Sequence, residues 1–396
     1  MNAKRVLSRF RAPYEQEAED RAWKIVRAAY RERERAAHHN SLRTAWGIAM
    51  TTILIAGVGA LSPDGATVVR LVDHAFEIPR AAAPVIAARA PSPQALVTDE
   101  QQNRLLVVDL PSGRIARSVP VPTDPEDIAT SGNGGVVLVV SSQAGKVTVL
   151  NRETLQTIKT FSGFQQPHIA AIAPDGSYAY ITDDPRGTLT VIRLSDMKVT
   201  ETVVVGAGAH HLAFSPTERT VWVALGESAQ QITTLSTVTR RPSPQSNPVT
   251  DPGLPHVTGH FVPGFPAHDL AFSPDGRTIW VTSAVGSDVT AFDARTHRVR
   301  FRIPVGAPPQ HLVFEGQYAY LTSGYGSTIE KVSATTGKVI TRTTAPYGSF
   351  ELDAADGYVV SSSLLDGTLA IYTPNLKLVR VVKLAPAARE VAISRP

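Results

Sequence analysis

The most constraining feature of this chain is a unit of 42 residues, spanning residues 167–208, that recurs along most of its length. The unit reads PHIAAIAPDGSYAYITDDPRGTLTVIRLSDMKVTETVVVGAG. The apolar HIAAIA, the alternating SYAYITD, TLTVIRL and KVTETVVVG are four predicted strands. PDG, DPRG and SDM are predicted turns, in which proline sets φ and glycine accepts a positive φ. The unit is therefore a four-stranded β-meander.

Copies of this meander follow one another at nearly constant spacing. The apolar residue that opens the first strand of each copy stands at Ile128, Ala170, Leu212, Leu270, Leu312, Leu352 and Val391. The intervals are 42, 42, 58, 42, 40 and 39 residues. A four-stranded unit that repeats about every 40–45 residues is typical of the blades of a β-propeller.

The two ends of the repeat region complement each other. Residues 387–394 contain a lone first strand, and residues 94–121 contain three strands that lack a first one. Joined, they make one blade, and this closure removes the exposed sheet edges that would otherwise favour aggregation. We therefore predict an all-β fold, in which residues 93–396 form a seven-bladed β-propeller closed by pairing of the N- and C-terminal strands.

The second strands carry a recurring motif. They read YAYITDD, TVWVALG, TIWVTSA, YAYLTSG and YVVSSS, and the turns before three of them read APDG at Ala173–Gly176, SPTE at Ser215–Glu218 and SPDG at Ser273–Gly276. This pattern resembles the YVTN-type propeller family over roughly 300 residues, although no second strand here ends in Thr-Asn. The resemblance implies the fold, whereas propellers of this kind serve many functions.

The first 43 residues are highly charged. Residues 14–38 contain neither glycine nor proline, and their apolar residues Trp23, Val26 and Tyr30 fit one face of a predicted helix. Two interpretations stay open for this segment. It is either a solvated cytosolic helix beside a membrane or a docking helix for a partner or a second copy.

Residues 44–61 form an uncharged stretch of 18 residues, about the minimum for a membrane-spanning helix. Trp46 stands near one end, and four arginines lie between residues 31 and 43. The positive-inside rule then predicts a single-pass anchor with a cytoplasmic N-terminus and an extracytoplasmic propeller. A cleaved signal peptide and a buried helix are the alternatives. Residues 62–92, with an isolated SPDG, are a predicted connector.

The composition limits the kinds of partner and site that the chain can have. The net charge is +4 over 396 residues, which argues against a nucleic-acid partner held by a strong field. There are no cysteines, so disulfides and thiolate metal sites are excluded.

One copy of the repeat is longer than its neighbours. The 58-residue interval contains about 16 extra residues, near residues 240–257, between the predicted third and fourth strands. Five prolines in this insertion are expected to exclude regular strand pairing. The insertion is either a partner contact or a neutral surface excursion.

Polar residues gather just before each opening residue. The nearer position holds Asp127, Ile169, His211, Asp269, His311, Glu351 and Glu390, and the farther one holds Glu126, His168, His210, His268, Gln310, Phe350 and Arg389. Because the first strand of every propeller blade lines the central channel, these side chains are predicted to converge on one funnel. Asp183, Asp184 and Arg186 are predicted to extend its rim.

We take nine of these residues as the candidate ligand-binding set: Asp127, His168, His210, His211, His268, Asp269, His311, Glu351 and Glu390. Three interpretations compete. In the first, the residues bind a small molecule or peptide. In the second, they bind a divalent metal, with His211, His268 and His311 as ligands. In the third, the polar side chains form hydrogen bonds with the backbone of the next blade and stabilise the fold. Apart from such a metal, no cofactor is expected.

These observations favour a membrane-anchored binding scaffold or sensor that engages a protein or small molecule. The alternatives are a propeller enzyme of the lactonase or streptogramin-lyase type and an adhesion or structural protein. The chain contains no H-E-x-x-H, no G-x-S-x-G and no phosphate-binding loop. A binding role is therefore favoured over an enzymatic one.

Overall fold

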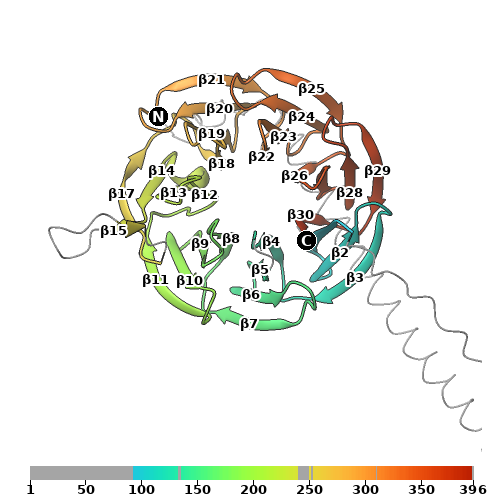
Figure 1. Cartoon of the computed structure of the whole chain (residues 1–396), viewed down its shortest axis with the longest axis horizontal. Helices are drawn as coiled ribbons and strands as arrows, with labels where there is room; N and C mark the ends of the chain where they lie inside the picture. Colours follow the sequence, from blue (N-terminus) through green and yellow to red (C-terminus); the bar gives the residue numbers. More distant parts are fainter. Residues whose placement is uncertain (1–91, 133–134, 240–248, 251–252, 309, 395–396) are drawn as a thin grey trace, which may run out of the picture. The chain divides into compact units, whose positions relative to one another are not determined.

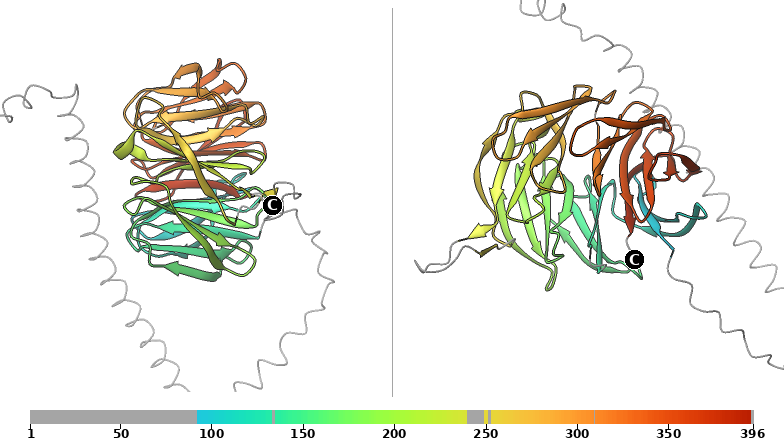
Figure 2. Two further views of the ribbon diagram at one scale, coloured as in Figure 1. Left: turned by 90° about the vertical axis from the view of Figure 1, so that its left-hand side faces the viewer. Right: turned by 45° about the horizontal axis from the view of Figure 1, so that its top comes forward.

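The computed structural model describes residues 92–132, 135–239, 249–250, 253–308 and 310–394. Within them, seven four-stranded antiparallel sheets are arranged around a common centre (Figure 1). In six of these sheets the strands run outward in chain order, with the first strand nearest the axis and the fourth on the rim, and in the seventh the C-terminal β30 is innermost. Viewed from the side, the sheets form a thick disc (Figure 2). The predicted seven-bladed propeller is confirmed.

The blades are numbered here in the order in which their first strands occur. Blade 1 contains β4 (Pro125–Thr130), β5 (Val136–Ser141), β6 (Lys146–Asn151) and β7 (Thr157–Ser162), and blade 2 contains β8 (Pro167–Ile172), β9 (Tyr178–Asp183), β10 (Thr188–Arg193) and β11 (Lys198–Val204). Blade 3 contains β12 (Leu212–Phe214), β13 (Thr220–Ala224), β14 (Ile232–Ser236) and β17 (His256–Phe261), with the short helix α4 (Gly226–Ala229) between β13 and β14.

The remaining blades follow the same plan. Blade 4 contains β18 (Ala267–Phe272), β19 (Thr278–Ser283), β20 (Asp288–Asp293) and β21 (Val299–Pro304), and blade 5 contains β22 (Leu312–Glu315), β23 (Tyr318–Thr322), β24 (Thr328–Ser333) and β25 (Val339–Thr344). Blade 6 contains β26 (Ser349–Ala355), β27 (Tyr358–Ser363), β28 (Thr368–Tyr372) and β29 (Leu378–Lys383), and blade 7 contains β30 (Ala388–Ser394), β1 (Gln94–Asp99), β2 (Arg104–Asp109) and β3 (Arg114–Pro120).

The ring closes through the two ends of the described chain. The C-terminal β30 pairs antiparallel with β1, with Gln94 opposite Ser394 and Val97 opposite Val391. Ile393 on β30 is buried. The last strand thus completes the blade begun by the first three, as the split repeat predicted.

The core lies between the blades. Strands two and three are nearly continuous runs of buried residues, as VVLVVS in β5 shows, because neighbouring blades cover both of their faces. Trp280 and Val289 of blade 4, for example, pack against Leu312 and Leu321 of blade 5. Each such side chain contributes about 1.5–3 kcal/mol when it is fully buried. The fourth strands are largely exposed, although each of them carries apolar side chains, such as Ile115 on β3 and Val299 on β21.

The threonine of the second-strand motif has a structural role. In four blades its hydroxyl accepts a hydrogen bond from the backbone N–H of the residue preceding the opening residue: Thr98 from Glu390 (2.9 Å), Thr182 from Ile169 (3.0 Å), Thr282 from Asp269 (2.9 Å) and Thr322 from His311 (3.1 Å). These bonds fix the start of the first strand and, with it, the side chains that point to the axis.

The insertion in blade 3 differs in part from its prediction. It lies between the third and fourth strands, as expected, but β15 (Val238–Thr239) pairs with β16 (Val249–Thr250). The expectation that the prolines exclude regular pairing is therefore wrong, because both short strands lie outside the proline positions. The backbone carbonyl of Gly253 accepts a hydrogen bond from the hydroxyl of Thr200 (3.0 Å), so this end of the insertion rests on blade 2.

Three predicted parts lie outside the described residues: the charged segment 1–43 with its predicted helix, the predicted span 44–61 and nearly all of the connector 62–92. Among the residues that the structure describes, no helix has the length and apolar character needed to cross a membrane.

Candidate functional site

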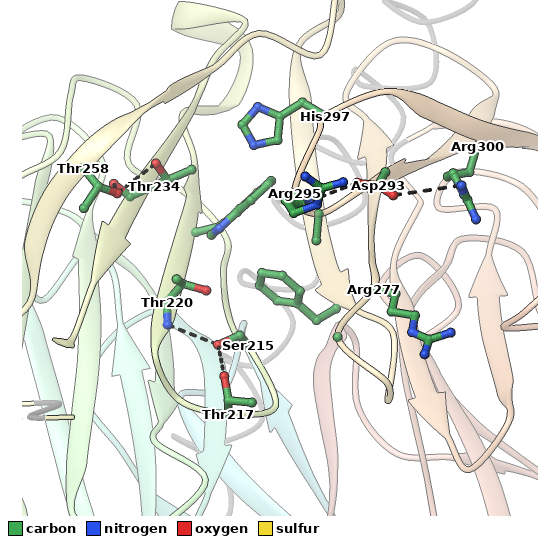
Figure 3. A pocket seen from close by; sticks show the side chains of 14 residues that line it. Ser215, Thr217, Thr220, Thr234, Thr258, Arg277, Asp293, Arg295, His297 and Arg300 are labelled. Atoms are coloured by element: carbon green, nitrogen blue, oxygen red, sulfur yellow. Dashed lines mark hydrogen bonds and ion pairs between the residues drawn. The ribbon is translucent and has the colours of Figure 1, made fainter. Parts of the chain in front are cut away.

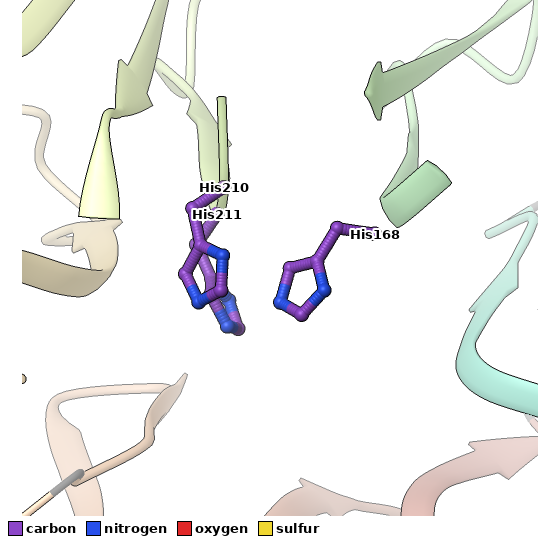
Figure 4. Close-up of side chains that lie close together, drawn as sticks. All are labelled: His168, His210 and His211. Carbon is purple, nitrogen blue, oxygen red and sulfur yellow. The ribbon is translucent and has the colours of Figure 1, made fainter. Parts of the chain in front are cut away.

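Five histidines from four consecutive blades meet at the axis: His168 from blade 2, His210 and His211 from the start of blade 3, His268 from blade 4 and His311 from the start of blade 5. The ring of His168 stacks on that of His210, with centroids 3.8 Å apart and planes inclined by 14° (Figure 4). We call these five residues the imidazole cluster. The structure thus brings together all five histidines that the repeat alignment selected.

Within the cluster, ring nitrogens from different blades approach closely. His210 Nε2 lies 3.2 Å from His268 Nδ1, and His268 Nε2 lies 3.2 Å from His311 Nε2. The two nitrogens of His268 therefore face two different histidines.

Carboxylates contact the cluster from behind. His211 Nδ1 lies 3.2 Å from an oxygen of Asp269, and His311 Nδ1 lies 2.5 Å from an oxygen of Glu351. These contacts occupy the Nδ1 side of both rings. Consequently, the Nε2 atoms of His211 and His311 are the ones available for a ligand.

Burial keeps the imidazoles neutral. Loss of hydration lowers the pKa of His168, His211 and His311 to about 4, and that of His268 falls well below its usual value for the same reason. Neighbouring histidines reinforce the shift, since a second positive charge nearby is unfavourable. At neutral pH the rings are uncharged, which is the form that coordinates metals.

The opposite side of the axis is ionic. Arg389 of blade 7 pairs with Glu100 (3.2 Å) and with Glu126 (2.6 Å), and Glu126 also contacts His168 Nδ1 (3.2 Å). Burial by itself would raise the pKa of Glu126, but the His168 hydrogen bond and the Arg389 charge together lower it to about 2. This ion triad links blades 7 and 1 to the imidazole cluster.

Two aspartates hold neighbouring blades together. An oxygen of Asp127 accepts a hydrogen bond from Ala170 N–H of the next blade (2.7 Å), and an oxygen of Asp269 accepts one from Leu312 N–H of the next blade (3.0 Å). This is the backbone-bonding role considered for these positions. Asp127 has this role alone, whereas Asp269 also contacts His211 and His311.

Burial raises the pKa values of three carboxyl groups near the axis. Loss of hydration raises the pKa of Asp127 to about 7, and it raises the pKa values of Glu351 and Glu390 well above their usual range. Their mutual repulsion adds to the shift. The central region is therefore rich in acid and poor in positive charge.

A count of the described groups makes this imbalance explicit. The carboxyl groups at or beside the axis are Glu100, Asp124, Glu126, Asp127, Asp184, Asp269, Glu351 and Glu390. Facing them is one guanidinium, that of Arg389, which is already paired. Such a region favours a cation over an anion.

The predicted rim residues divide into different roles. Asp184 lies 3.6 Å from His210 Nδ1 and belongs to the site. Asp183 is buried and accepts backbone hydrogen bonds from Gln165 (2.7 Å) and Gln166 (3.2 Å), so it stabilises a loop. Arg186 is half exposed and lies 3.8 Å from Asp183, away from the histidines.

Three partners were absent from the sequence-based set. Glu126 and Arg389 stand at aligned positions but were not selected, and Glu100 follows the second strand of blade 7. An alignment of the second-strand ends would have found Glu100, because Asp99–Glu100 corresponds to Asp183–Asp184.

A separate pocket of about 630 Å³ lies between blades 3 and 4, among the turns that join strands one to two and three to four (Figure 3). Its lining includes Trp222, Phe272, several threonines and His297. His297 has a positive φ of 58° and packs edge-on against Trp222. Its arginines, including Arg277 and Arg300, are exposed and lie beside Asp275 and Asp293, so the pocket offers no buried charged group to a ligand.

No known family profile matches the chain. It is 24% identical over 187 residues to a 6-phosphogluconolactonase of Enterobacter sp. (strain 638), covering 45% of this chain and 55% of that protein. It is 27% identical over 95 residues to the uncharacterized protein YncE of Salmonella typhi, covering 24% of this chain and 27% of that protein. The chain thus spans about half, or less, of the length of these curated relatives.

Among solved structures, the chain is similar to a functionally unknown protein from Desulfotomaculum acetoxidans DSM 771. The TM-score is 0.65 at 16% identity, covering 77% of this chain and all of that one. At this identity the likeness shows the fold alone. The chain is therefore a seven-bladed β-propeller that is distantly related to 6-phosphogluconolactonases and to YncE.

Proposed function

We propose that this protein is a metal-binding propeller, in which Nε2 atoms of His211, His268 and His311 hold a divalent transition-metal ion at the axis. One observation carries the proposal. Three imidazoles from consecutive blades have their possible ligand atoms within 4.8 Å of one another. The His268 Nε2 to His311 Nε2 distance of 3.2 Å is close to the separation of about 3.3 Å between two nitrogens bound tetrahedrally at 2.0–2.1 Å from zinc.

The surroundings of the three rings support this assignment. A metal-bound histidine usually donates its other N–H to a carboxylate or similar acceptor, which fixes the tautomer and the ring orientation. Asp269 stands behind His211, Glu351 stands behind His311, and the ring of His210 stands behind His268. Each proposed ligand therefore has an outer partner.

Electrostatics supports a cation at the same place. Burial, reinforced by neighbouring carboxyl groups, raises the pKa values of Asp127, Glu351 and Glu390, and the charge of Arg389 opposes the shift only in part. A divalent ion beside neutral imidazoles would supply further positive charge. Three protein ligands also leave one tetrahedral position for water or for an external ligand.

The other histidine triad, formed by His168, His210 and His211, also has ligand atoms within 4.8 Å of one another. Here, however, the rings of His168 and His210 are stacked almost parallel at 3.8 Å. Ring-plane lone pairs of stacked imidazoles run side by side and do not converge on one point. The tight site is therefore assigned to His211, His268 and His311.

The distant similarity to 6-phosphogluconolactonases favours a second candidate, a lactonase. A metal-bound water at the open position could attack a lactone carbonyl. The charge distribution argues against a phosphorylated substrate, since Arg389 is already neutralised by Glu100 and Glu126. Hydrolysis of an uncharged lactone that requires the metal would support this candidate.

The cellular setting of the proposal comes from the sequence. Residues 44–61 remain a predicted single-pass anchor that places the propeller outside the cytoplasm, where the protein would act as a binding scaffold or sensor. Extraction of the full chain from membranes by detergent, but not by salt or alkali, tests this prediction. Release by alkali would contradict it.

The metal assignment is tested by titrating the chelator-stripped, tag-free chain with Co²⁺ or Zn²⁺ and following calorimetry and the Co²⁺ spectrum. We expect one ion per chain in the native protein. His311→Ala and His268→Ala should weaken binding by more than the 10–100-fold that loss of an outer partner costs. His256→Ala, which removes an exposed histidine on β17, is the control. Equal affinity in all four proteins would overturn the proposal.

A further inference from the structure

We infer that the pocket between blades 3 and 4 binds a planar aromatic molecule that carries an anionic group. The pocket lies on the face of the propeller opposite the starts of the first strands, so it is separate from the imidazole cluster. Its volume of about 630 Å³ is within the range of about 300–1,000 Å³ that is usual for small-molecule sites. The inference does not rest on the proposed metal site.

The pocket is open because one side chain is missing from blade 3. In blade 4, Phe301 of the fourth strand is aligned, through the third strand, with Trp280 of the second. In blade 3, the residue aligned in the same way with Trp222 is Gly259. The other five blades all have a larger residue at this position, namely Arg117, Lys159, Glu201, Thr341 and Arg380. Of the seven described blades, blade 3 alone has no side chain here.

In other blades, the side chain at this position covers the contact with the next blade. The ring of Phe301 packs edge-on against Trp280, with centroids 5.4 Å apart. It also reaches the next blade, since a Cβ atom built on Gly337 would clash with it. Arg380 approaches Gly113 of the following blade equally closely. The open place in blade 3 is therefore one that a planar group occupies elsewhere in the ring.

Neither the backbone nor the packing requires a glycine at position 259. The φ of Gly259 lies outside the left-handed region, so other residues adopt this conformation. Apart from the chain neighbours, a Cβ atom built on it would meet within 4 Å only one described atom, Thr234 Oγ1, at 3.6 Å, which is an ordinary contact. His297 of blade 4 is not within that distance, so the glycine does not make room for it. We therefore attribute the open place to a ligand and not to the folding of blade 3.

The inner wall of the pocket is aromatic. Trp222 and Phe272 lie edge-on with centroids 5.5 Å apart, and His297 lies edge-on to Trp222 at 5.3 Å. The indole N–H of Trp280 donates a hydrogen bond to Thr278 Oγ1 (3.2 Å), whereas that of Trp222 forms none with a described residue. An aromatic ring packs well against such a wall, and a polar atom of the ligand can accept a hydrogen bond from this N–H.

The mouth of the pocket is positively charged. The lining contains three arginines, Arg277, Arg295 and Arg300, and one carboxylate, that of Asp293. Blade 4 contributes all four, and blade 3 contributes the hydroxyl groups (Figure 3). The ion pairs of the arginines are long, 3.9 Å for Arg277 with Asp275 and 4.0 Å for Arg300 with Asp293. An anionic group is therefore favoured at the exposed mouth, while the ring of the ligand enters between the blades.

The test is calorimetric titration of the full-length, tag-free chain with 2-naphthoate. We expect one molecule bound per chain. Naphthalene-2-carboxamide, which lacks the charge, and decahydronaphthalene-2-carboxylate, which lacks the planar ring, should each bind more weakly by about fivefold or more. Absence of 2-naphthoate binding would overturn the inference, and equal binding of either analogue would overturn the ligand class.

Gly259→Phe places a ring where blade 4 has Phe301 and should weaken 2-naphthoate binding by about tenfold or more, because the two rings would clash. Thr341→Phe is the matched control, since it introduces the same side chain at the same position of blade 5 and should leave binding unchanged. Equal affinity in Gly259→Phe and the native chain would place the probe elsewhere and reject the pocket.

A second pair of variants tests the mouth without altering the core. Arg295→Gln combined with Arg300→Gln should weaken 2-naphthoate binding by about fivefold, as expected for exposed charges, and should leave carboxamide binding unchanged. Arg298→Gln combined with Arg302→Gln is the control, because both are exposed arginines of blade 4 that do not line the pocket. Equal losses in both pairs would reject the anion site. The His311→Ala chain should bind 2-naphthoate normally, so failure of the metal site and failure of this inference are distinguishable.

Discussion

The two sides of the propeller axis are built on the same repeated backbone position and differ in how their charges are balanced. Blades 2–5 contribute the imidazole cluster, whose rings are neutral and face one another. Blades 6, 7 and 1 contribute Glu351, Glu390, Glu126, Asp127 and Arg389, which we call the ionic half. The first side offers lone pairs to a ligand. In the second, Glu126 is held ionised beside Arg389, whereas burial disfavours ionisation of the other three carboxyl groups.

Asp127 and Asp269 show the difference most clearly. Both accept a backbone hydrogen bond from the next blade, at 2.7 Å and 3.0 Å. Burial raises the pKa of Asp127 to about 7, although the guanidinium of Arg389 opposes the shift in part. Burial also opposes ionisation of Asp269, but the adjacent His211 and His311 hold its pKa at about 2. The same inter-blade hydrogen bond is therefore accepted by an ionised carboxylate in Asp269 and by a carboxyl group whose ionisation is disfavoured in Asp127.

Among the variants that test this comparison, Arg389→Met should cause the largest change, a loss of stability. The substitution leaves Glu100 and Glu126 buried without their cation, and loss of one partner of a buried ion pair costs about 3–5 kcal/mol. Chemical denaturation measures the change. Arg193→Met is the control, since it breaks an exposed pair with Asp196, which water and salt screen. A change below 1 kcal/mol for Arg389→Met would show that the ionic half does not depend on this guanidinium.

The second-largest effect, on the Co²⁺ affinity, should distinguish Asp269 from Asp127. Asp269→Asn removes the carboxylate behind His211 and should weaken Co²⁺ binding by about 10–100-fold, the usual loss for an outer-shell partner. Asp127→Asn removes an equivalent inter-blade acceptor from the ionic half and should leave the Co²⁺ affinity within about twofold, because Asp127 contacts no proposed ligand. Equal losses in both variants would mean that blade alignment, not the outer shell, sets the affinity.

The pH dependence of metal-free stability should show a smaller effect with two opposing contributions. Three imidazoles have a native pKa of about 4, against 6.5 when unfolded, so the unfolded state binds more protons in this window and stability should rise from about pH 4 to 6.5. Asp127, with a native pKa of about 7 against 3.8, binds its proton more tightly when folded. Its contribution is complete at low pH and is lost as the pH rises through about 7.

Melting temperatures measured from pH 4 to 9 with a chelator present test both contributions. Stability should rise to about pH 6.5, because the histidine contributions outweigh that of Asp127. Asp127→Asn should steepen this rise, because it removes an opposing contribution that is lost between about pH 3.8 and 7, and His211→Gln should flatten it. A profile in which the two variants exchanged these effects would show that the contributions are assigned to the wrong halves.

The smallest effect should come from the insertion in blade 3. Thr239 lies opposite Val249, so residues 240–248 can be replaced by Asn-Gly, which favours a two-residue hairpin turn. The free energy of unfolding should change by less than about 0.5 kcal/mol and Co²⁺ binding should be unchanged, because the described part of the insertion contacts blade 2 and no described member of either half. Loss of metal binding in this variant would extend the site beyond the axis.

The sequence by itself determined the repeat, the number of blades, the closure of the ring and the positions from which side chains reach the axis. These follow from local periodicity, because each meander forms from neighbouring residues and each turn from its own proline or glycine. The opening residues, from Ile128 to Val391, were identified in this way. So were the five histidines, because a fixed offset from a strand start becomes a fixed place in the ring.

Only the tertiary structure decided what those side chains do to one another. It engaged Nδ1 of His311 with Glu351, gave Asp127 a backbone-bonding role, and brought Glu100 and Arg389 together across nearly the whole chain. The physical reason is that such contacts join different blades or the two ends of the chain, at least 40 residues apart in most cases. Their distances are set by closure of the ring and by burial, neither of which has a period that can be read along the sequence.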